Sequence, residues 1–204
     1  MICASSGIRY QSVLPRETGL VGESSCIHLA YWKGYGMKIT AVFLASSDEL
    51  VGDRIGIGDF FRELNNILVP RGEYLKLIKW EWGSHAIAPT RKQEEYNELL
   101  READLCLLLF CTKLGEYTRE EFNVALGAYE QKGAPKLTIW FRKVPEGQTM
   151  SPELQKFTDQ LGKLKLLWNA YDTLDALKLG ILTQLKLDGL GEVEDALRVR
   201  DPTN

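Results

Sequence analysis

A glutamate at the start of a predicted helix is the side chain of this sequence with the strongest indication of a chemical role. Thr118 and Glu121 have the T-x-x-E spacing of a capping box, in which the glutamate accepts a hydrogen bond from a backbone N–H at the helix start. Glu121 also begins a stripe of small apolar residues at helical spacing, Val124, Ala125 and Ala128, which indicates that it points inward. Two interpretations stay open: Glu121 either caps the helix or is a catalytic carboxylate at a buried helix end.

Two serines and an aspartate, Ser46, Ser47 and Asp48, directly follow an apolar run that predicts a strand. Hydroxyl and carboxylate side chains in this place can contact a ligand. The same residue types also cap the helix that follows a strand. Both interpretations stay open for these three residues.

Further candidates lie between the second and third predicted strands. Arg91 and Lys92 begin a predicted helix, where cations oppose the helix dipole, so they indicate either an anionic ligand or acidic neighbour, or two solvated surface charges. Trp80 and Trp82 alternate along a strand and face one side. One of them can lie in the core, while Trp82 at the strand end can stack on the planar ring of a ligand.

The usual cofactor and metal signatures are missing from the sequence. The G-I-G at 56–58 has Phe61 where a dinucleotide-binding fingerprint has its third glycine, and no G-x-x-x-x-G-K-[ST] loop occurs. The four cysteines include no C-x-x-C pair and the chain has two histidines, so a zinc site or a histidine-based triad is poorly supported. We expect neither a metal nor a bound cofactor.

The composition is that of an ordinary globular protein, with 45% hydrophobic and 26% charged residues. A formal net charge of −3 gives no general attraction to nucleic acid or to an anionic membrane. The longest apolar runs are too short to cross a bilayer. We therefore expect a reduced, cytoplasmic protein that binds neither nucleic acid nor membrane directly.

Five strand-like segments alternate with amphipathic helices and must position the candidate side chains. The strands are predicted at 38–45, 73–82, 104–111, 136–141 and 163–171. Strands separated by helices indicate an α/β fold with a parallel sheet. We predict a flavodoxin-like sheet of five parallel strands in the order 2-1-3-4-5, with helices on both faces.

Ligand sites in such sheets lie beyond the carboxyl ends of the strands. In this sequence that edge consists of Ser46 to Asp48, residues 82–91 and residues 111–118, and Glu121 follows shortly after. The predicted fold therefore gathers the candidate residues at one edge of the sheet.

Regular patterning begins at Met37 and ends near residue 187, which predicts one α/β domain over 37–187. Residues 1–36 have neither helical nor strand periodicity. Our hypothesis is that this leader is an over-extended gene prediction and that the native chain begins at Met37; an ordered N-terminal arm is the alternative. N-terminal mass spectrometry of the native protein distinguishes the two. Residues 188–204 lack a strong pattern, and we expect this tail to fray.

Three blocks of the sequence resemble prokaryotic Toll/interleukin-1 receptor (TIR)-like domains, whose superfamily includes the nucleoside 2-deoxyribosyltransferases. These blocks are VFLASSDEL, KWEW…PTRKQEEYNELLREADLCLLLF and GEYTREEFNVAL…KGAPK, and the resemblance spans residues 38–187. It implies a flavodoxin-like fold and cleavage of an N-glycosidic bond, which in many TIR members is that of NAD⁺. The family's catalytic glutamate, with an alanine four residues later and a small hydroxyl or thiol residue three before it, matches Glu121, Ala125 and Thr118.

The chain departs from the family pattern in two places. Its first strand ends in FLASS rather than in the F-I-S-Y/H of many TIR domains, and the loop after the second predicted strand is unlike the receptor-type loop. Contacts of signalling adaptors are therefore not carried over to this chain.

The resemblance also implies roles for the remaining candidates. Ser46 and Ser47 would touch the ribose or the phosphates of NAD⁺, Arg91 would bind the pyrophosphate, and Trp82 or Tyr117 would pack against a ring. Nicotinamide leaves NAD⁺ as a neutral group, so the reaction needs no strong general acid. We also expect the positive end of the helix to favour the ionised form of Glu121.

Three functions follow from the sequence. The resemblance implies an NAD⁺ nucleosidase, a hydrolase of bacterial antiphage defence that is activated by homo-oligomeric assembly and acts with a partner defence protein. The first alternative is a deoxyribosyltransferase-like enzyme acting on nucleosides or nucleotides. The second is a non-catalytic interaction module, in which Glu121 serves only as the capping box.

Overall fold

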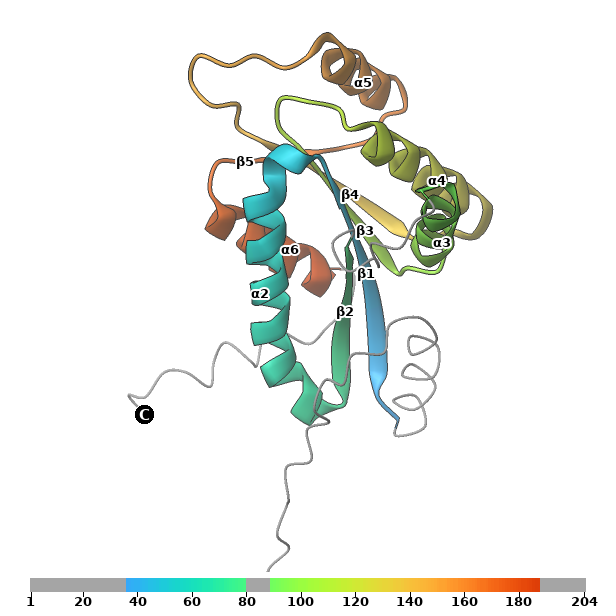
Figure 1. Cartoon of the computed structure of the whole chain (residues 1–204). Helices are drawn as coiled ribbons and strands as arrows, with labels where there is room; N and C mark the ends of the chain where they lie inside the picture. Colours follow the sequence, from blue (N-terminus) through green and yellow to red (C-terminus); the bar gives the residue numbers. More distant parts are fainter. Residues whose placement is uncertain (1–35, 80–88, 188–204) are drawn as a thin grey trace, which may run out of the picture.

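The computed structural model describes residues 36–79 and 89–187, with side chains from residue 94 onward in the second range. The predicted leader, except for Gly36, and the predicted tail lie outside these residues. Five parallel strands form one sheet in the order β2-β1-β3-β4-β5, as the sequence predicts (Figure 1). The strands are β1 (Lys38–Ser46), β2 (Glu73–Lys79), β3 (Leu105–Phe110), β4 (Lys136–Arg142) and β5 (Asn169–Tyr171).

Helices cover both faces of the sheet. They are α2 (Val51–Leu68), α3 (Pro89–Arg101), α4 (Glu116–Lys132), α5 (Pro152–Lys163) and α6 (Leu174–Leu187). The short 3₁₀ turns η1 (Asp48–Leu50) and η2 (Val69–Arg71) flank α2. Helices α2 and α6 pack on one face, and α3, α4 and α5 pack on the other (Figure 1). The flavodoxin-like α/β architecture predicted from the sequence is therefore confirmed.

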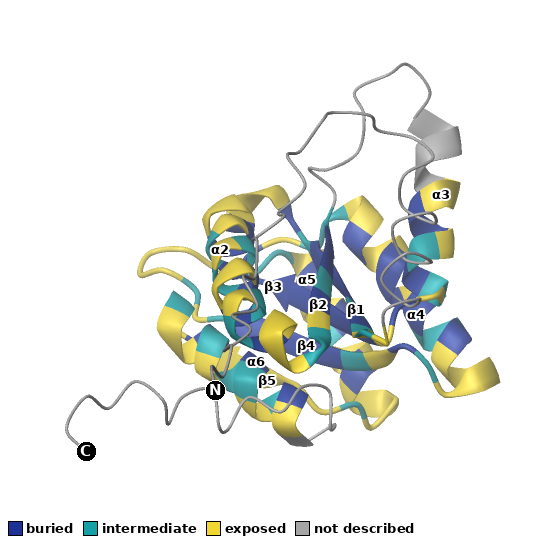
Figure 2. Cartoon of the chain, turned by 90° about the horizontal axis from the view of Figure 1, so that it is seen from below, coloured by how far each residue is buried: buried dark blue, intermediate teal, exposed yellow. Residues whose placement is uncertain are grey.

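The central strand β3 explains why its sequence is continuously apolar. All six of its residues are buried, because helices lie over both of its faces (Figure 2). Alternate side chains point to opposite faces, so Leu107 joins the core under α2 and α6 while Leu108 joins the core under α3, α4 and α5.

The register of the sheet sets the position of the first loop. Strand β1 lies between β2 and β3, and Ser46 at its end pairs with Leu109 near the end of β3. The chain leaves both strands at the same edge, so the loop after β1 and the loop before α4 become neighbours.

The fifth strand is shorter than predicted. Strand β5 covers only Asn169–Tyr171, whereas the sequence predicts a strand over 163–171. Helix α5 runs to Lys163, and a turn follows in which Lys165 has a positive φ of 56° and Leu166 N–H donates to the Leu161 carbonyl. These local bonds replace strand pairing, so the apolar alternation before residue 169 was misleading.

The helix boundaries follow the capping rules in two places. Ser151 caps α5 by accepting a hydrogen bond from Leu154 N–H, with Pro152 in the first turn. Gly133 ends α4 with a φ of 74°, a conformation that glycine adopts without steric cost.

Among the helices of the described residues, none is both long and apolar enough to cross a membrane.

Candidate active site

A cavity of about 340 Å³ opens where the loop after β1 meets the start of α4, at the carboxyl edge of the sheet. Six of the predicted site residues line it: Ser46, Ser47, Asp48, Tyr117, Thr118 and Glu121. Gly115, within the predicted edge segment 111–118, and Arg54, which the sequence reasoning missed, line it as well. Trp82 lies outside the described residues, and for Arg91 only the backbone, within α3, is described.

The start of α4 differs from the predicted capping box. Gly115 is the N-cap, and it has no side chain to accept a hydrogen bond, so Thr118 lies inside the first turn and Glu121 in the second. The site is tight at this position: a Cβ here would lie 3.0 Å from the Thr118 hydroxyl and in ordinary contact, 3.7 Å, with Ser47 Cα. The capping interpretation of Glu121 was therefore wrong, and its side chain faces the cavity instead.

Glu121 is almost completely buried, with 6% of its surface exposed. Burial raises the pKa of its carboxyl from 4.5 to about 8; Glu120 also raises it, and Arg54 lowers it. The raised pKa disfavours the ionised form at neutral pH, contrary to the prediction from the helix dipole. The dipole acts within the first turn of a helix, and Glu121 lies one turn further along.

The neighbouring Glu120 has a different environment. It is exposed, and its Oε1 accepts a hydrogen bond of 2.9 Å from the buried amide of Asn97 on α3. Of the two adjacent glutamates, only Glu121 lines the cavity. The structure thus separates two residues of identical chemistry into a surface carboxylate and a buried one.

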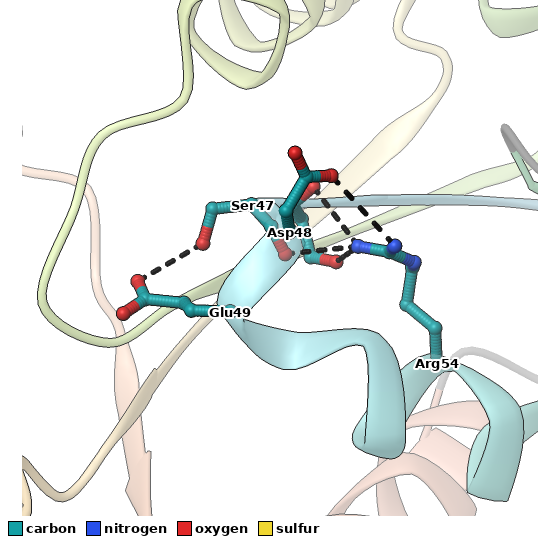
Figure 3. A network of polar contacts seen from close by, with 5 residues as sticks. Ser47, Asp48, Glu49 and Arg54 are labelled. Atoms are coloured by element: carbon teal, nitrogen blue, oxygen red, sulfur yellow. Dashed lines mark hydrogen bonds and ion pairs between the residues drawn. The ribbon is translucent and has the colours of Figure 1, made fainter.

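Arg54 is the main residue that the sequence reasoning missed. It is 5% exposed, and its Nη1 donates to the Ser46 hydroxyl and to the Ser47 carbonyl, each at 2.9 Å (Figure 3). Helical spacing places it in the apolar stripe of α2, four residues after Leu50 and three before Ile57. A cation within an apolar stripe is the signal that indicates a special role.

Glu49, also missed, joins the two loops that border the cavity. Its carboxylate accepts hydrogen bonds from the Ser47 hydroxyl at 3.0 Å, from Thr112 N–H at 3.0 Å, from the Thr112 hydroxyl and from Lys113 N–H at 2.9 Å. Burial raises the pKa of Glu49, but these hydrogen bonds outweigh it and hold the pKa below 4.5. The anion of Glu49 therefore ties the loop after β1 to the loop after β3.

The hydroxyl groups of Ser46 and Ser47 both make hydrogen bonds within the protein. The hydroxyl of Ser46 accepts from Arg54, and the hydroxyl of Ser47 donates to Glu49 (Figure 3). Each hydroxyl keeps further hydrogen-bonding capacity, since it can both donate and accept. These contacts hold the rim of the cavity in place.

A polar cluster around the buried Asp53 anchors the helix that carries Arg54. Asp53 accepts two hydrogen bonds from Arg142 Nη1, at 3.0 and 3.1 Å, and one from the Tyr171 hydroxyl at 2.7 Å. Burial, followed by the bond to Asp53, raises the pKa of Tyr171, which stays a donor. Strands β4 and β5 thereby fix the first turn of α2.

Within the described ranges, no three His, Cys, Asp or Glu side chains are grouped so as to hold a metal ion.

No protein family and no curated protein matches this sequence. Among solved structures, the chain is similar to the CMP N-glycosidase BcmB of Clostridium botulinum, with 14% identity and a TM-score of 0.45 over 70% of this chain and 98% of that chain. It is also similar to the TIR domain heterodimer of RPS4 and RRS1, with 10% identity and a TM-score of 0.43 over 73% of this chain and 96% of that one. Structural similarities this weak give no information about the activity of this chain.

Proposed function

We propose that this chain is an NAD⁺ nucleosidase that cleaves the bond between nicotinamide and ribose with Glu121 in the cavity. The observation that supports the proposal is a buried carboxylate lining a cavity at the carboxyl edge of a parallel sheet, surrounded by hydroxyl groups and one buried cation. Glu121 is also the residue that matches the catalytic glutamate in the sequence resemblance. A capping role, the other interpretation of this residue, does not fit a helix whose N-cap is Gly115.

The proposed reaction breaks the bond between ribose C1′ and the pyridinium nitrogen. The bonding electrons go to the nitrogen, so nicotinamide leaves as a neutral molecule and positive charge develops on the ribose. An ionised carboxylate beside the sugar stabilises that charge, as in glycoside hydrolysis. Water then adds to C1′ and releases a proton, which gives ADP-ribose.

The raised pKa of Glu121 sets a condition on this chemistry. In the ligand-free protein the carboxyl keeps its proton up to a pH of about 8, and the protonated form cannot stabilise a developing cation. A substrate that brings a positive charge into the cavity favours the loss of that proton. The cationic nicotinamide ring of NAD⁺ meets this requirement, whereas an uncharged nucleoside does not.

The cellular setting is inferred from the sequence resemblance. We infer a cytoplasmic enzyme of bacterial defence against phage, activated when several copies assemble. Assays of activity therefore include a crowding agent, which promotes assembly at a given protein concentration.

The direct test incubates the full chain with NAD⁺, with and without the crowding agent, and measures free nicotinamide by chromatography. We expect release by the wild type, and a loss of about a hundredfold or more in Glu121→Gln, because the amide carries no charge to stabilise the transition state. Glu120→Gln is the matched control and should retain activity. The proposal is wrong if no sample releases nicotinamide, or if both variants lose activity equally. Base exchange between deoxynucleosides with NAD⁺ left intact would instead indicate the transferase.

A further inference from the structure

We propose that Glu49 is a positioning residue, which sets the affinity of the cavity for its substrate without touching the substrate. Glu49 is not among the described residues that line the cavity, but Ser47, which it holds, is one of them. The inference rests on the proposed function only in taking this cavity as the substrate site.

The carboxylate of Glu49 bridges two segments that are far apart in the sequence. It accepts a hydrogen bond from the Ser47 hydroxyl, in the loop that follows β1 (Figure 3). It also accepts from the N–H and the hydroxyl of Thr112 and from the N–H of Lys113, in the segment that follows β3. Four donors converge on one carboxylate, so this side chain sets the spacing between the two segments.

The two segments that Glu49 joins supply different parts of the cavity wall. Ser46, Ser47 and Asp48 come from the loop after β1, whereas the segment after β3 leads into α4, which carries Glu121. A substrate that contacts the serines while its reacting bond lies beside Glu121 needs both parts of the wall at the correct spacing. Glu49 therefore acts on the substrate through the residues that it holds.

The segment after β3 has a second anchor that does not depend on Glu49. The Thr112 carbonyl accepts a hydrogen bond of 2.7 Å from Ser151 N–H at the start of α5. Helix α4, which follows, packs its own apolar side chains into the core. Loss of Glu49 should therefore leave Glu121 in place and free the loop after β1 to move relative to it. We expect weaker binding and a chemical step that is nearly unchanged.

Two substitutions of Glu49 separate the bridge from the fold. Glu49 is an exposed residue, so water can replace its hydrogen bonds in Glu49→Ala, and this variant should fold. Water does not hold the two segments at a fixed spacing. Glu49→Gln keeps an oxygen that accepts hydrogen bonds, and the Thr112 hydroxyl can turn to accept one from the new amide. This conservative variant should preserve the spacing.

The test measures binding of NAD⁺ by calorimetry in the Glu121→Gln background, with chromatography to verify that NAD⁺ is not consumed. We expect Glu49→Ala to weaken binding about tenfold and Glu49→Gln to weaken it by no more than about threefold. Asp59→Ala is the matched control. It removes the same charge from an exposed residue of α2 whose ion pair is with Arg62 of the same helix, and it should leave the affinity unchanged.

A milder substitution tests the same link from its other end. Thr112→Val removes the hydroxyl that donates to Glu49 and keeps the shape of the side chain. We expect it to weaken NAD⁺ binding about twofold to fourfold, and to have no further effect once Glu49 is alanine. Effects that multiply in the double variant would show that the two residues act independently, which would contradict the proposal.

Steady-state kinetics of the protein with Glu121 intact distinguish positioning from a general loss of structure. Glu49→Ala should raise the KM for NAD⁺ by about the same factor as the loss of affinity and leave kcat within about twofold. A general loosening of the fold would lower kcat, and Glu49→Gln would not rescue it. A fall in kcat at constant KM would contradict the positioning role.

Unchanged affinity in Glu49→Ala, an equal loss in Glu49→Ala and Glu49→Gln, or no binding of NAD⁺ at millimolar concentration would overturn this inference. Binding is measured without turnover, so its outcome is separate from that of the proposed function. A loss of affinity in Glu49→Ala, in a protein whose wild type releases no nicotinamide, would support the positioning role and contradict the nucleosidase.

Discussion

The surroundings of Glu121 shift the pKa of its carboxyl group in opposite directions. Burial against the end of the sheet and the nearby Glu120 raise its pKa, while Arg54 lowers it, and the balance lies at about 8. A carboxyl group with such a pKa gains its charge close to physiological pH, so binding of a charged ligand can change its protonation state. This property belongs to the single residue and its immediate neighbours.

The proton on Glu121 should be visible in the stability of the protein. The folded chain holds this proton up to a pH of about 8 and the unfolded chain only to about 4.5, so the free energy of unfolding falls as pH rises between these values. Glu121→Gln carries no such proton. We expect its stability relative to the wild type to increase through this window, by at most about 1.4 kcal/mol per pH unit, and to level off above it.

Urea denaturation at several pH values measures this difference. Glu120→Gln, the same substitution at the exposed neighbouring position, is the control. A difference for Glu121→Gln that stays constant across the window would show that the buried carboxyl titrates normally.

At the scale of residues, the sequence indicated Glu121 as a residue of this edge of the sheet but did not indicate Arg54, although both line the cavity. Glu121 heads an apolar stripe and matches a family motif, so both local pattern and resemblance indicated it. The sequence did not indicate Glu49, because its hydrogen-bond partners Thr112 and Lys113 are distant in the sequence. It did not indicate Arg54, because the helix pattern does not reveal the hydrogen bond to the Ser47 carbonyl. The capping box was wrong because the T-x-x-E spacing does not show where the helix begins.

At the scale of elements, helix α6 is fitted closely to the sheet. Gly180 faces Trp140 of β4, and a Cβ at this position would lie 2.2 Å from Cη2 of the indole ring. Gly180 is therefore a packing glycine, which allows the helix to approach a large aromatic side chain. The same close approach keeps Ile181 and Leu185 within the core.

Gly180→Ala should destabilise the protein, because the indole cannot move away without disturbing the core. We expect a loss of about 1 to 3 kcal/mol in the free energy of unfolding, measured by urea denaturation. Gly127→Ala in α4 is the matched control: apart from the adjoining backbone of its own helix, no atom of the described residues lies within 4 Å of the added Cβ. Alanine in a helix interior stabilises by about 0.5 to 1 kcal/mol relative to glycine. Equal effects of the two substitutions would contradict this account of the packing.

At the scale of the whole molecule, strand order and layering were predictable from the sequence because alternating strands and helices permit few topologies. The parallel sheet then brings the ends of β1 and β3 to one edge, where Ser47 meets the loop that ends at Gly115. Segment lengths were less predictable, as β5 shows, since an apolar stretch does not reveal whether it pairs as a strand. The global fold therefore determines where the cavity lies, and local contacts determine which charged side chains line it.

The most direct test of the central claim is the pH dependence of nicotinamide release by the wild type, measured as kcat/KM. This ratio reports the protonation state of the free enzyme, and the proposed reaction needs Glu121 ionised. We predict a rise of about tenfold per pH unit below a pH of about 8 and a plateau above it. A profile that is flat through this range, or that falls as pH rises, would contradict the role of Glu121 as the catalytic carboxylate.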